Sequence, residues 1–338
     1  MKALVVAPSW IGDSVLAQPL FTRLHERIPG LQLDALAPRW VAPVLERMPQ
    51  INRIIDSPFA HGELSLRTRH RVARELARGG YQRAYVLPNS LKSALIPFLA
   101  DIPERIGFIG ETRYGLINRR HTLDKKLLPQ MAERFAQLAE APGAPLPRPL
   151  PQPCLHASPA QRIETLAALG VSLPAKLAVF CPGAEYGPAK RWPARHFAAL
   201  AAALARHGYA VWLLGSAKDR PVGEEILDHA SPGSLPLNLC GTTTLAQAID
   251  LLGAASLVVC NDSGLMHVAA ALGRRVVAVY GSSSPDFTPP LSEKATIISL
   301  NLACSPCFKR QCPLGHLDCL QQLEPQRVLA ACLGGVAA

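Results

Sequence analysis

The chain has 338 residues, enough for two domains of ordinary size. Hydrophobic residues make up 49% and charged residues 18%, which excludes a disordered chain and predicts two substantial cores. Lysine and arginine number 35 against 25 acidic residues, a net charge of +10 with neutral histidines. This excess favours an anionic partner such as nucleic acid, acidic lipid or a phosphorylated substrate, with a basic enzyme that has no such partner as the alternative.

Neither a secretion signal nor a membrane-spanning segment is expected. The first apolar run ends at Pro8-Ser9 without a cleavage-like site, and Pro97, Asp101 and Arg206 interrupt the other long apolar stretches. The sequence therefore predicts a cytoplasmic protein. Its nine cysteines are then expected to be thiols or metal ligands rather than disulfides.

In the first half, β-rich runs alternate with helical segments. Strands are predicted at 2–7, 31–37, 53–56, 83–87 and 105–108, and helices at 14–28, 40–47, 63–78, around Lys92 and at 126–140. Asp13 ends the glycine-bearing loop after the first strand, where open α/β sheets bind ligands. Helix capping and catalysis both remain open for this residue.

A proline-rich stretch divides the chain. Six prolines between 142 and 153 alternate with small and apolar residues, a pattern typical of a stiff extended connector. The sequence therefore predicts a domain at 1–155 and a second domain at 156–338.

The second half repeats the alternation. Strands are predicted at 177–180, 209–214, 237–240, 257–260 and 275–280, and helices at 160–169, 194–207, 245–255 and 265–272. Four strand ends carry small, hydroxyl or charged residues, namely 181–193 with Lys190 and Arg191, 215–219 with Asp219, 241–244 with Thr243, and 261–264. Since parallel strands end at one edge of a sheet, this convergence predicts a nucleotide site.

The turn after strand 257–260 has the composition of a phosphate site. Gly264 allows a ligand close to the backbone, Ser263 supplies a hydroxyl, and the first helical N–H groups attract anions. Asp262 or Ser263 capping the helix, and His267 packing in the core, are the alternatives.

Long motifs in both halves carry a resemblance to a known family. They are WIGD, HGEL, YVLPNSLKSALIPF, ETRYGLIN, PGAEYGPAKRWP, GSAKD and NDSGLMHVAAALGRRVVAVYGSSSPDFTPP. Over residues 1 to about 300 the chain resembles the ADP-heptose:lipopolysaccharide heptosyltransferases of glycosyltransferase family 9, in particular those of type II. The resemblance implies an α/β GT-B fold, in which two Rossmann-like parallel-sheet domains face each other across a cleft.

The implied reaction is inverting transfer of L-glycero-D-manno-heptose from ADP-heptose to the first heptose of the lipopolysaccharide inner core, on a Kdo-lipid A acceptor. Domain 1–155 would bind the acceptor at the inner face of the inner membrane, and domain 156–338 the nucleotide sugar. No cofactor is implied for catalysis, and no DxD motif is present. The oligomeric state is not predicted.

The resemblance also implies roles for individual residues. Asp13 matches the general base and Lys190 the diphosphate-binding lysine, whereas neighbouring Arg191 could face solvent. The other implied donor-site residues are Asp219 at the ribose, Thr243 at the nucleoside, and Asp262, Ser263, Gly264 and His267 around the phosphates. Arginines from Arg67 to Arg78, Lys92, Arg105 and Arg113 are candidates for binding the anionic acceptor.

Two other functions are alternatives. A sugar-nucleotide epimerase of GT-B fold would have a similar nucleotide-binding site in its C-terminal domain. A nucleic-acid-binding protein would explain the charge, but the basic residues are dispersed, aromatic residues are only 6%, and no RNA-binding signature is present.

The segment 304–319 carries four cysteines, Cys304, Cys307, Cys312 and Cys319, with His316 among them. The close first pair resembles half of a metal knuckle, so the spacing predicts a structural zinc or iron site. Its ligands would be the four cysteines, or three of them with His316, between the last strand and the C-terminal helix and away from catalysis. Unligated thiols in a reduced loop are the alternative.

Overall fold

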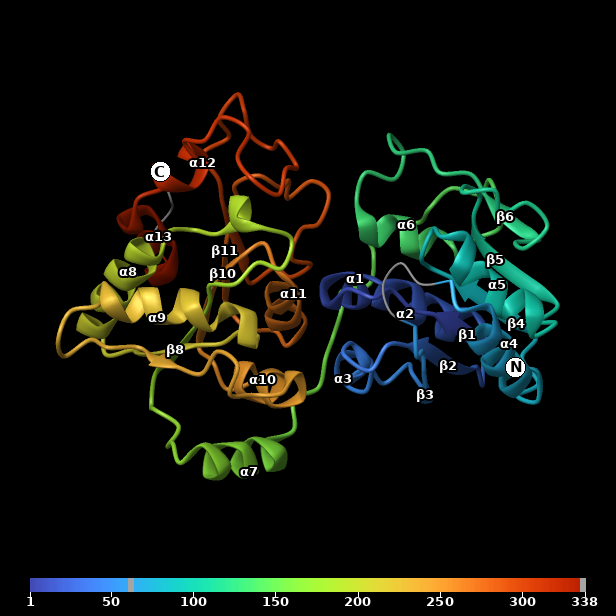
Figure 1. The fold of residues 1–338 in the computed structure, drawn as a ribbon, viewed down its shortest axis with the longest axis horizontal. Helices are drawn as coiled ribbons and strands as arrows, with labels where there is room; N and C mark the ends of the chain where they lie inside the picture. Colours follow the sequence, from blue (N-terminus) through green and yellow to red (C-terminus); the bar gives the residue numbers. More distant parts are fainter. Residues whose placement is uncertain (60–63, 335–338) are drawn as a thin grey trace. The chain divides into compact units, whose positions relative to one another are not determined.

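The structure, a computed structural model, describes residues 1–59 and 64–334. It divides into two compact units, Met1–Leu155 and His156–Ala338. Within the described residues each unit contains one six-stranded parallel sheet (Figure 1). Most of the HGEL motif, residues 61–63, lies outside the described residues.

Unit 1 is a doubly wound sheet with strand order β3-β2-β1-β4-β5-β6. Its strands are β1 (Lys2–Val6), β2 (Gln32–Ala37), β3 (Arg53–Asp56), β4 (Arg83–Val86), β5 (Glu104–Phe108) and β6 (Arg119–His121). Its helices are α1 (Ile11–Leu16), α2 (Gln18–Arg27), α3 (Ala42–Leu45), α4 (Leu66–Ala77), α5 (Leu91–Leu99) and α6 (Met131–Gln137). Helices α4 and α5 pack together against one face, and α2 packs with α6 (Figure 1). Because both faces are covered, the central strands are continuous apolar runs.

The helical segment predicted at 14–28, with Pro19 as a kink or late start, is two helices. Pro19 occupies the first turn of α2, and α1 ends before it. Two features of unit 1 differ from the prediction. Helix α1 begins at Ile11, so Asp13 lies in its first turn rather than in a loop. Strand β6 was missed, since it is a three-residue edge strand that begins with two arginines.

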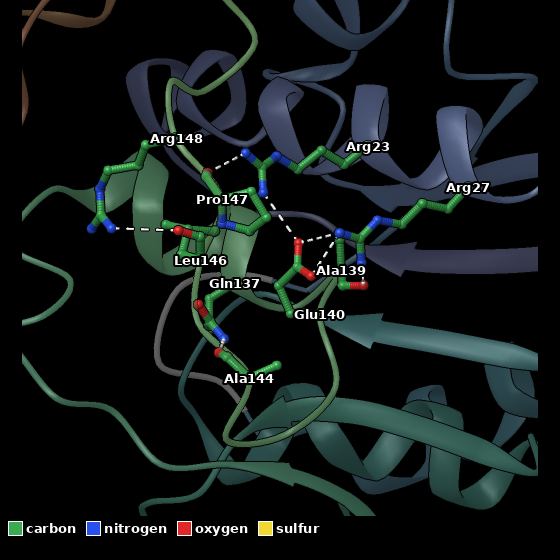
Figure 2. A network of polar contacts seen from close by, with 9 residues as sticks. All are labelled: Arg23, Arg27, Gln137, Ala139, Glu140, Ala144, Leu146, Pro147 and Arg148. Carbon is green, nitrogen blue, oxygen red and sulfur yellow. Dashed lines mark hydrogen bonds and ion pairs between the residues drawn. The ribbon is translucent and has the colours of Figure 1, made fainter.

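The proline-rich segment is anchored to unit 1 by side chains of α2 (Figure 2). The buried Arg23 guanidinium donates to Glu140 at 3.1 Å and to the carbonyl of Pro147, and Arg27 pairs with Glu140 at 2.6 Å. Gln18 exchanges two hydrogen bonds with the backbone of Cys154. Proline has no backbone N–H, so carbonyls in a proline-rich segment have few backbone donors nearby. Side chains of α2 donate hydrogen bonds to such carbonyls here. The segment expected to be a stiff connector is thus part of unit 1.

Unit 2 repeats the topology with strand order β12-β11-β10-β7-β8-β9. The strands are β7 (Leu177–Cys181), β8 (Ala210–Leu213), β9 (Leu237–Asn238), β10 (Leu257–Asn261), β11 (Val276–Val279) and β12 (Ala295–Ile298). The α-helices are α7 (Pro159–Leu169), α8 (Ala194–Arg206), α9 (Arg220–Asp228), α10 (Leu245–Leu252), α11 (Gly264–Ala271), α12 (Asp318–Gln321) and α13 (Pro325–Leu333), with short 3₁₀ turns at Pro188–Lys190 and Ala217–Asp219. Helix α8 packs against α9 and α13 on one face, and α10 contacts α7 and α11 (Figure 1). No described helix of either unit has the length and apolarity needed to cross a membrane.

Candidate functional site

The central strands of unit 2, β7 and β10, are neighbours in the sheet. The chain continues from β7 to β8 in one direction along the sheet and from β10 to β11 in the opposite direction. Loops after two such strands separate and leave room for a ligand, the usual binding position in doubly wound sheets. The loop after β7 carries Lys190, and the turn after β10 carries Asp262, Ser263 and Gly264. The topology therefore brings these predicted residues to one edge.

Lys190 and Asp262 form an ion pair across this edge. The ammonium lies 2.5 Å from the Asp262 carboxylate, and the two side chains are only 17% and 5% exposed. The Lys190 Nζ also lies 5.2 Å from the centre of the Tyr186 ring. Each charge compensates the desolvation of the other, and removing either would leave an uncompensated buried charge.

Asn261 holds the Lys190 loop at both ends. Its fully buried amide accepts from the Trp192 N–H at 3.0 Å and donates to the Pro182 carbonyl at 2.7 Å. The Trp192 indole is buried as well and donates to the Leu323 carbonyl at 2.8 Å. Neither Asn261 nor Trp192 was predicted from the sequence as a site determinant. A polar side chain closing an apolar strand was the available signal for Asn261.

Several buried polar atoms at this end of the sheet have no hydrogen-bond partner within the part of the chain that the structure describes. Among the predicted site residues they are Thr243 Oγ1, Ser263 Oγ and His267 Nδ1, and the missed residues Ser282 and Ser283 contribute two more hydroxyls. A buried polar group without a partner costs about 1–3 kcal/mol, so native sites of this kind usually bind a ligand or ordered water. Because β11 pairs with β10, Ser282 and Ser283 follow the strand next to Ser263.

The predicted helix capping by Asp262 or Ser263 is wrong. Ser263 occupies the N-cap position of α11, but its side chain makes no capping hydrogen bond, and the Asp262 carboxylate bonds Lys190 instead. His267, one turn into α11, is buried. Burial lowers the pKa of His267 to about 4, with Asp262 opposing the shift and Lys190 reinforcing it, so the imidazole is neutral near pH 7.

Asp219 is held at the end of β8 by a capping box. Its Oδ2 accepts hydrogen bonds from the N–H and the hydroxyl of Ser216 at 2.9 and 2.8 Å. A Cβ at Gly183 would lie 2.2 Å from Oδ1, and one at Gly215 would lie 2.8 Å from the Asp219 Cβ. Both glycines are therefore needed for Asp219 to occupy this place.

In unit 1, Asp13 is near the carboxyl end of the central strand β1. Trp10 precedes α1 and is 46% exposed, and Trp40 is 52% exposed while its indole donates to the Ser9 carbonyl at 2.9 Å. These two indoles were not predicted from the sequence as site residues. Exposed aromatic rings near a carboxylate offer a flat apolar surface with a polar tip, which suits a sugar ring.

Three of the candidate acceptor cations have structural roles. Arg113 is fully buried and donates to the carbonyls of Pro88 and Phe108, and Arg105 donates to those of Leu116 and Ile102. Arg69 is buried too, with its guanidinium on the backbone of residues 64 and 92. For the buried Arg113 and Arg69 the proposed acceptor role is therefore wrong, because their donors face the protein interior. The remaining arginines of the stretch, Arg67, Arg71, Arg74 and Arg78, are exposed.

The four cysteines of segment 304–319 line one small cavity with His316, Ala189 and Ser282. Burial, and then the nearby thiols of the other three cysteines, raise the pKa of Cys319 to about 11. Nevertheless, across residues 1–59 and 64–334 no group of three or more His, Cys, Asp or Glu side chains could hold a metal ion. Cys304 is exposed and Cys319 buried, so the thiols extend from surface to core, and the His316 Nδ1 accepts from the Asp318 N–H. The predicted zinc or iron site is not supported.

Comparison with known proteins agrees with this arrangement. The model of glycosyltransferase family 9 (heptosyltransferase) matches residues 69–318. The chain belongs to this family. It is 47% identical over 336 residues to lipopolysaccharide heptosyltransferase 2 of Salmonella typhimurium, covering 97% of each chain. The structure of E. coli ADP-heptose lps heptosyltransferase II superposes with a TM-score of 0.89 at 44% identity, over 99% of this chain and 98% of that one.

A family 9 structure from Veillonella parvula shares the fold, with a TM-score of 0.83 at 22% identity and coverage of 98% and 96%. The two doubly wound parallel sheets are those of a GT-B glycosyltransferase, so the predicted fold class is confirmed. Membership of family 9 favours neither an epimerase nor a nucleic-acid-binding protein.

The buried neutral His267 predicts a pH dependence of stability. In the unfolded chain the imidazole titrates near pH 6.5, so between about pH 6.5 and 4 the unfolded state binds a proton that the folded state does not. The free energy of unfolding therefore falls as the pH falls, by up to about 3 kcal/mol at pH 4. In urea titrations at several pH values, His267→Gln should lose this component, whereas exposed His207→Gln should keep it. Equal pH slopes for all three proteins would contradict the assignment.

Proposed function

We propose that this protein transfers L-glycero-D-manno-heptose from ADP-heptose to the first heptose of the lipopolysaccharide inner core, with inversion at the anomeric carbon. Family membership and the relatives at 47% identity support this substrate pair. The observation that carries the proposal is the largely buried Lys190–Asp262 pair beside the start of α11. It lies where the connections after β7 and β10 diverge in the unit 2 sheet.

The donor diphosphate would bind to Lys190 and the first N–H groups of α11. Asp262 fixes the ammonium and leaves donors of that ammonium for phosphate oxygens. The hydroxyls of Thr243 and Ser263, which have no partner among the described residues, would exchange hydrogen bonds with the nucleotide sugar, and Asp219 would bind the ribose. As the bond between the anomeric carbon and the phosphate oxygen breaks, negative charge grows on ADP, and a cation already in place stabilises it.

The chemical step needs one proton acceptor. The Asp13 carboxylate would take the proton of the acceptor hydroxyl while its oxygen bonds the anomeric carbon and ADP departs. Trp10, three residues before Asp13, and Trp40, bonded to the Ser9 carbonyl, provide exposed rings that suit the sugars of the acceptor. The proposed reaction uses these side chains without a cofactor.

Acceptor binding would occur at the cytoplasmic face of the inner membrane. The exposed arginines of α4 and its end, Arg67, Arg71, Arg74 and Arg78, recur at spacings of four, three and four residues and therefore share one helix face. A stripe of this kind suits acidic lipid and the phosphates of the acceptor, each arginine contributing about 1 kcal/mol.

Incubation with ADP-heptose and a core acceptor bearing one heptose tests the function directly. We expect the product mass to increase by one heptose residue, with release of ADP. Asp13→Asn should abolish transfer but retain ADP affinity, because the amide keeps the size of the side chain and cannot take the proton. Asp56→Asn, a matched change at a half-exposed carboxylate paired with Arg39, should transfer normally. Near-normal turnover of Asp13→Asn would place the base elsewhere.

Replacing Lys190 tests the diphosphate contact. Lys190→Ala should weaken ADP binding by about 1.5–3 kcal/mol in calorimetry and also slow turnover. In Lys190→Ala the buried Asp262 carboxylate loses its ion-pair partner. Adding Asp262→Asn removes that charge, so the double variant should be more stable than Lys190→Ala without regaining ADP affinity. Exposed Lys176→Ala serves as the control. Unchanged ADP affinity in Lys190→Ala would remove this lysine from the site.

The basic stripe predicts salt-sensitive binding to anionic vesicles. Arg71→Gln with Arg74→Gln should weaken binding to phosphatidylglycerol-containing vesicles by about 2 kcal/mol without changing ADP affinity. As a control, Arg39→Gln removes another exposed arginine, which is paired with Asp56 and lies outside the stripe. A co-sedimentation assay in which the double variant and Arg39→Gln bind alike would contradict a role for α4.

A further inference from the structure

The cysteine-rich segment lies against the loop that carries Lys190, contrary to the expectation that it sits away from the site. The Arg310 carbonyl accepts a hydrogen bond from the Ala189 N–H at 3.1 Å. The Phe308 carbonyl accepts from the Tyr186 hydroxyl at 2.9 Å. Ala189 also lines the cavity that the four cysteines share. Two backbone carbonyls, about 120 residues further along the chain, therefore hold Tyr186, just before the loop's 3₁₀ turn, and Ala189, at the centre of that turn.

The same segment is fastened to the turn after β11. The Phe308 N–H donates to the Ser282 carbonyl at 2.7 Å, and the Ser305 hydroxyl donates to the Gly281 carbonyl. The Ser282 hydroxyl is one of the buried atoms without a partner among the described residues. The segment thus bridges the loop after β7 and the turn after β11, on either side of the turn after β10.

Tyr186 joins this bridge to the charged pair. Its ring centre lies 5.2 Å from the Lys190 ammonium and 5.3 Å from the Arg310 guanidinium. A cation over an aromatic face is held by the ring quadrupole, by more when the site is partly desolvated. Since the hydroxyl of the same ring bonds Phe308, the position of the ring depends on the segment.

Gly187 shows how closely the two parts approach. A Cβ at this residue would lie 2.5 Å from the Arg310 carbonyl oxygen, a distance that real Cβ atoms do not tolerate. Any side chain here would push segment and loop apart. The sequence motif AEYGPAKRW therefore combines the ring, the required glycine and the lysine within five residues.

We propose that residues 302–317 are a positioning element of the nucleotide-sugar site, acting through Tyr186 on the ammonium of Lys190. The inference rests on the proposed function and assigns two further positioning residues to it, Tyr186 and Gly187. The segment supplies backbone carbonyls that orient the Tyr186 ring, and the ring together with Asp262 restricts the ammonium to the place where a diphosphate would bind. Tyr186 itself takes no part in the bond changes.

A double-mutant cycle tests this mechanism with ADP as the probe. Tyr186→Leu should weaken ADP binding by about three- to tenfold in calorimetry, the range expected for a partly desolvated cation–π contact. If Tyr186 acts through Lys190, the same change in a Lys190→Ala background should alter the ADP affinity by less than about twofold. Tyr186→Phe keeps the ring but removes its hydrogen bond to the Phe308 carbonyl, so its ADP affinity should lie between those of wild type and Tyr186→Leu. Wild-type ADP affinity in Tyr186→Phe would overturn the role of the segment. In both variants the donor KM should rise more than kcat falls.

Matched controls separate positioning from general damage. Gly187→Ala should lower ADP affinity, whereas Gly208→Ala, at a turn of unit 2 with no atom within 4 Å of the added Cβ, should not. Tyr209→Phe is the corresponding control for Tyr186→Phe. The melting temperature of each variant is measured alongside, so a loss of affinity that parallels a loss of folding overturns the proposal.

The remaining outcomes are decisive. An undiminished effect of Tyr186→Leu in the Lys190→Ala background would mean that the ring contacts ADP directly and would overturn the positioning role. Normal ADP affinity in Tyr186→Leu, with wild type binding ADP and Lys190→Ala impaired, would overturn this inference but leave the proposed function intact. Absence of ADP binding by wild type would overturn the proposed function itself.

Discussion

The ion pair between Lys190 and Asp262 is the interaction on which the rest of unit 2 depends. Both charges are largely removed from water, and their mutual attraction compensates the cost only while the geometry is maintained. That geometry is set by Asn261, whose amide bonds both ends of the Lys190 loop, and by the buried Trp192. On the other side, Tyr186 and the carbonyls of the cysteine-rich segment contact the loop. A flexible side chain is thereby held in one position, as the proposed contact with a diphosphate requires.

The two units share one topology but carry different polar groups at the carboxyl ends of their central strands. Unit 2 combines an ammonium, a helix N-terminus and hydroxyls that lack a partner in the described part of the chain, which suits a phosphate-bearing ligand. Unit 1 has a carboxylate in the first turn of α1 with exposed indoles nearby. These are complementary requirements of glycosyl transfer, since a leaving diphosphate needs positive charge and an attacking hydroxyl needs a base.

Arginine performs two separate tasks in unit 1, so the net charge alone overstates the basic surface. Arg23 and Arg113 are buried and donate to backbone carbonyls that proline-rich or irregular segments leave without partners. Arg71 and Arg74 face solvent on α4. Only the second group contributes to a surface that can attract an anionic membrane, so the effective basic patch is smaller than the composition suggests.

Local sequence patterns were sufficient to predict most of the central strands and the family. Continuous apolar runs predicted nearly all the central strands, because a parallel strand buried on both faces needs no partner information to be recognised. The long motifs identified the family and placed Lys190, Asp262 and Ser263 at strand ends. Tertiary structure decided which polar atoms pair. Asp262 bonds Lys190 rather than capping α11, Arg113 satisfies carbonyls rather than a ligand, and the cysteine segment lies on the Lys190 loop. Each of these contacts joins residues some 25 to more than 100 positions apart, and neither spacing nor propensity contains that information.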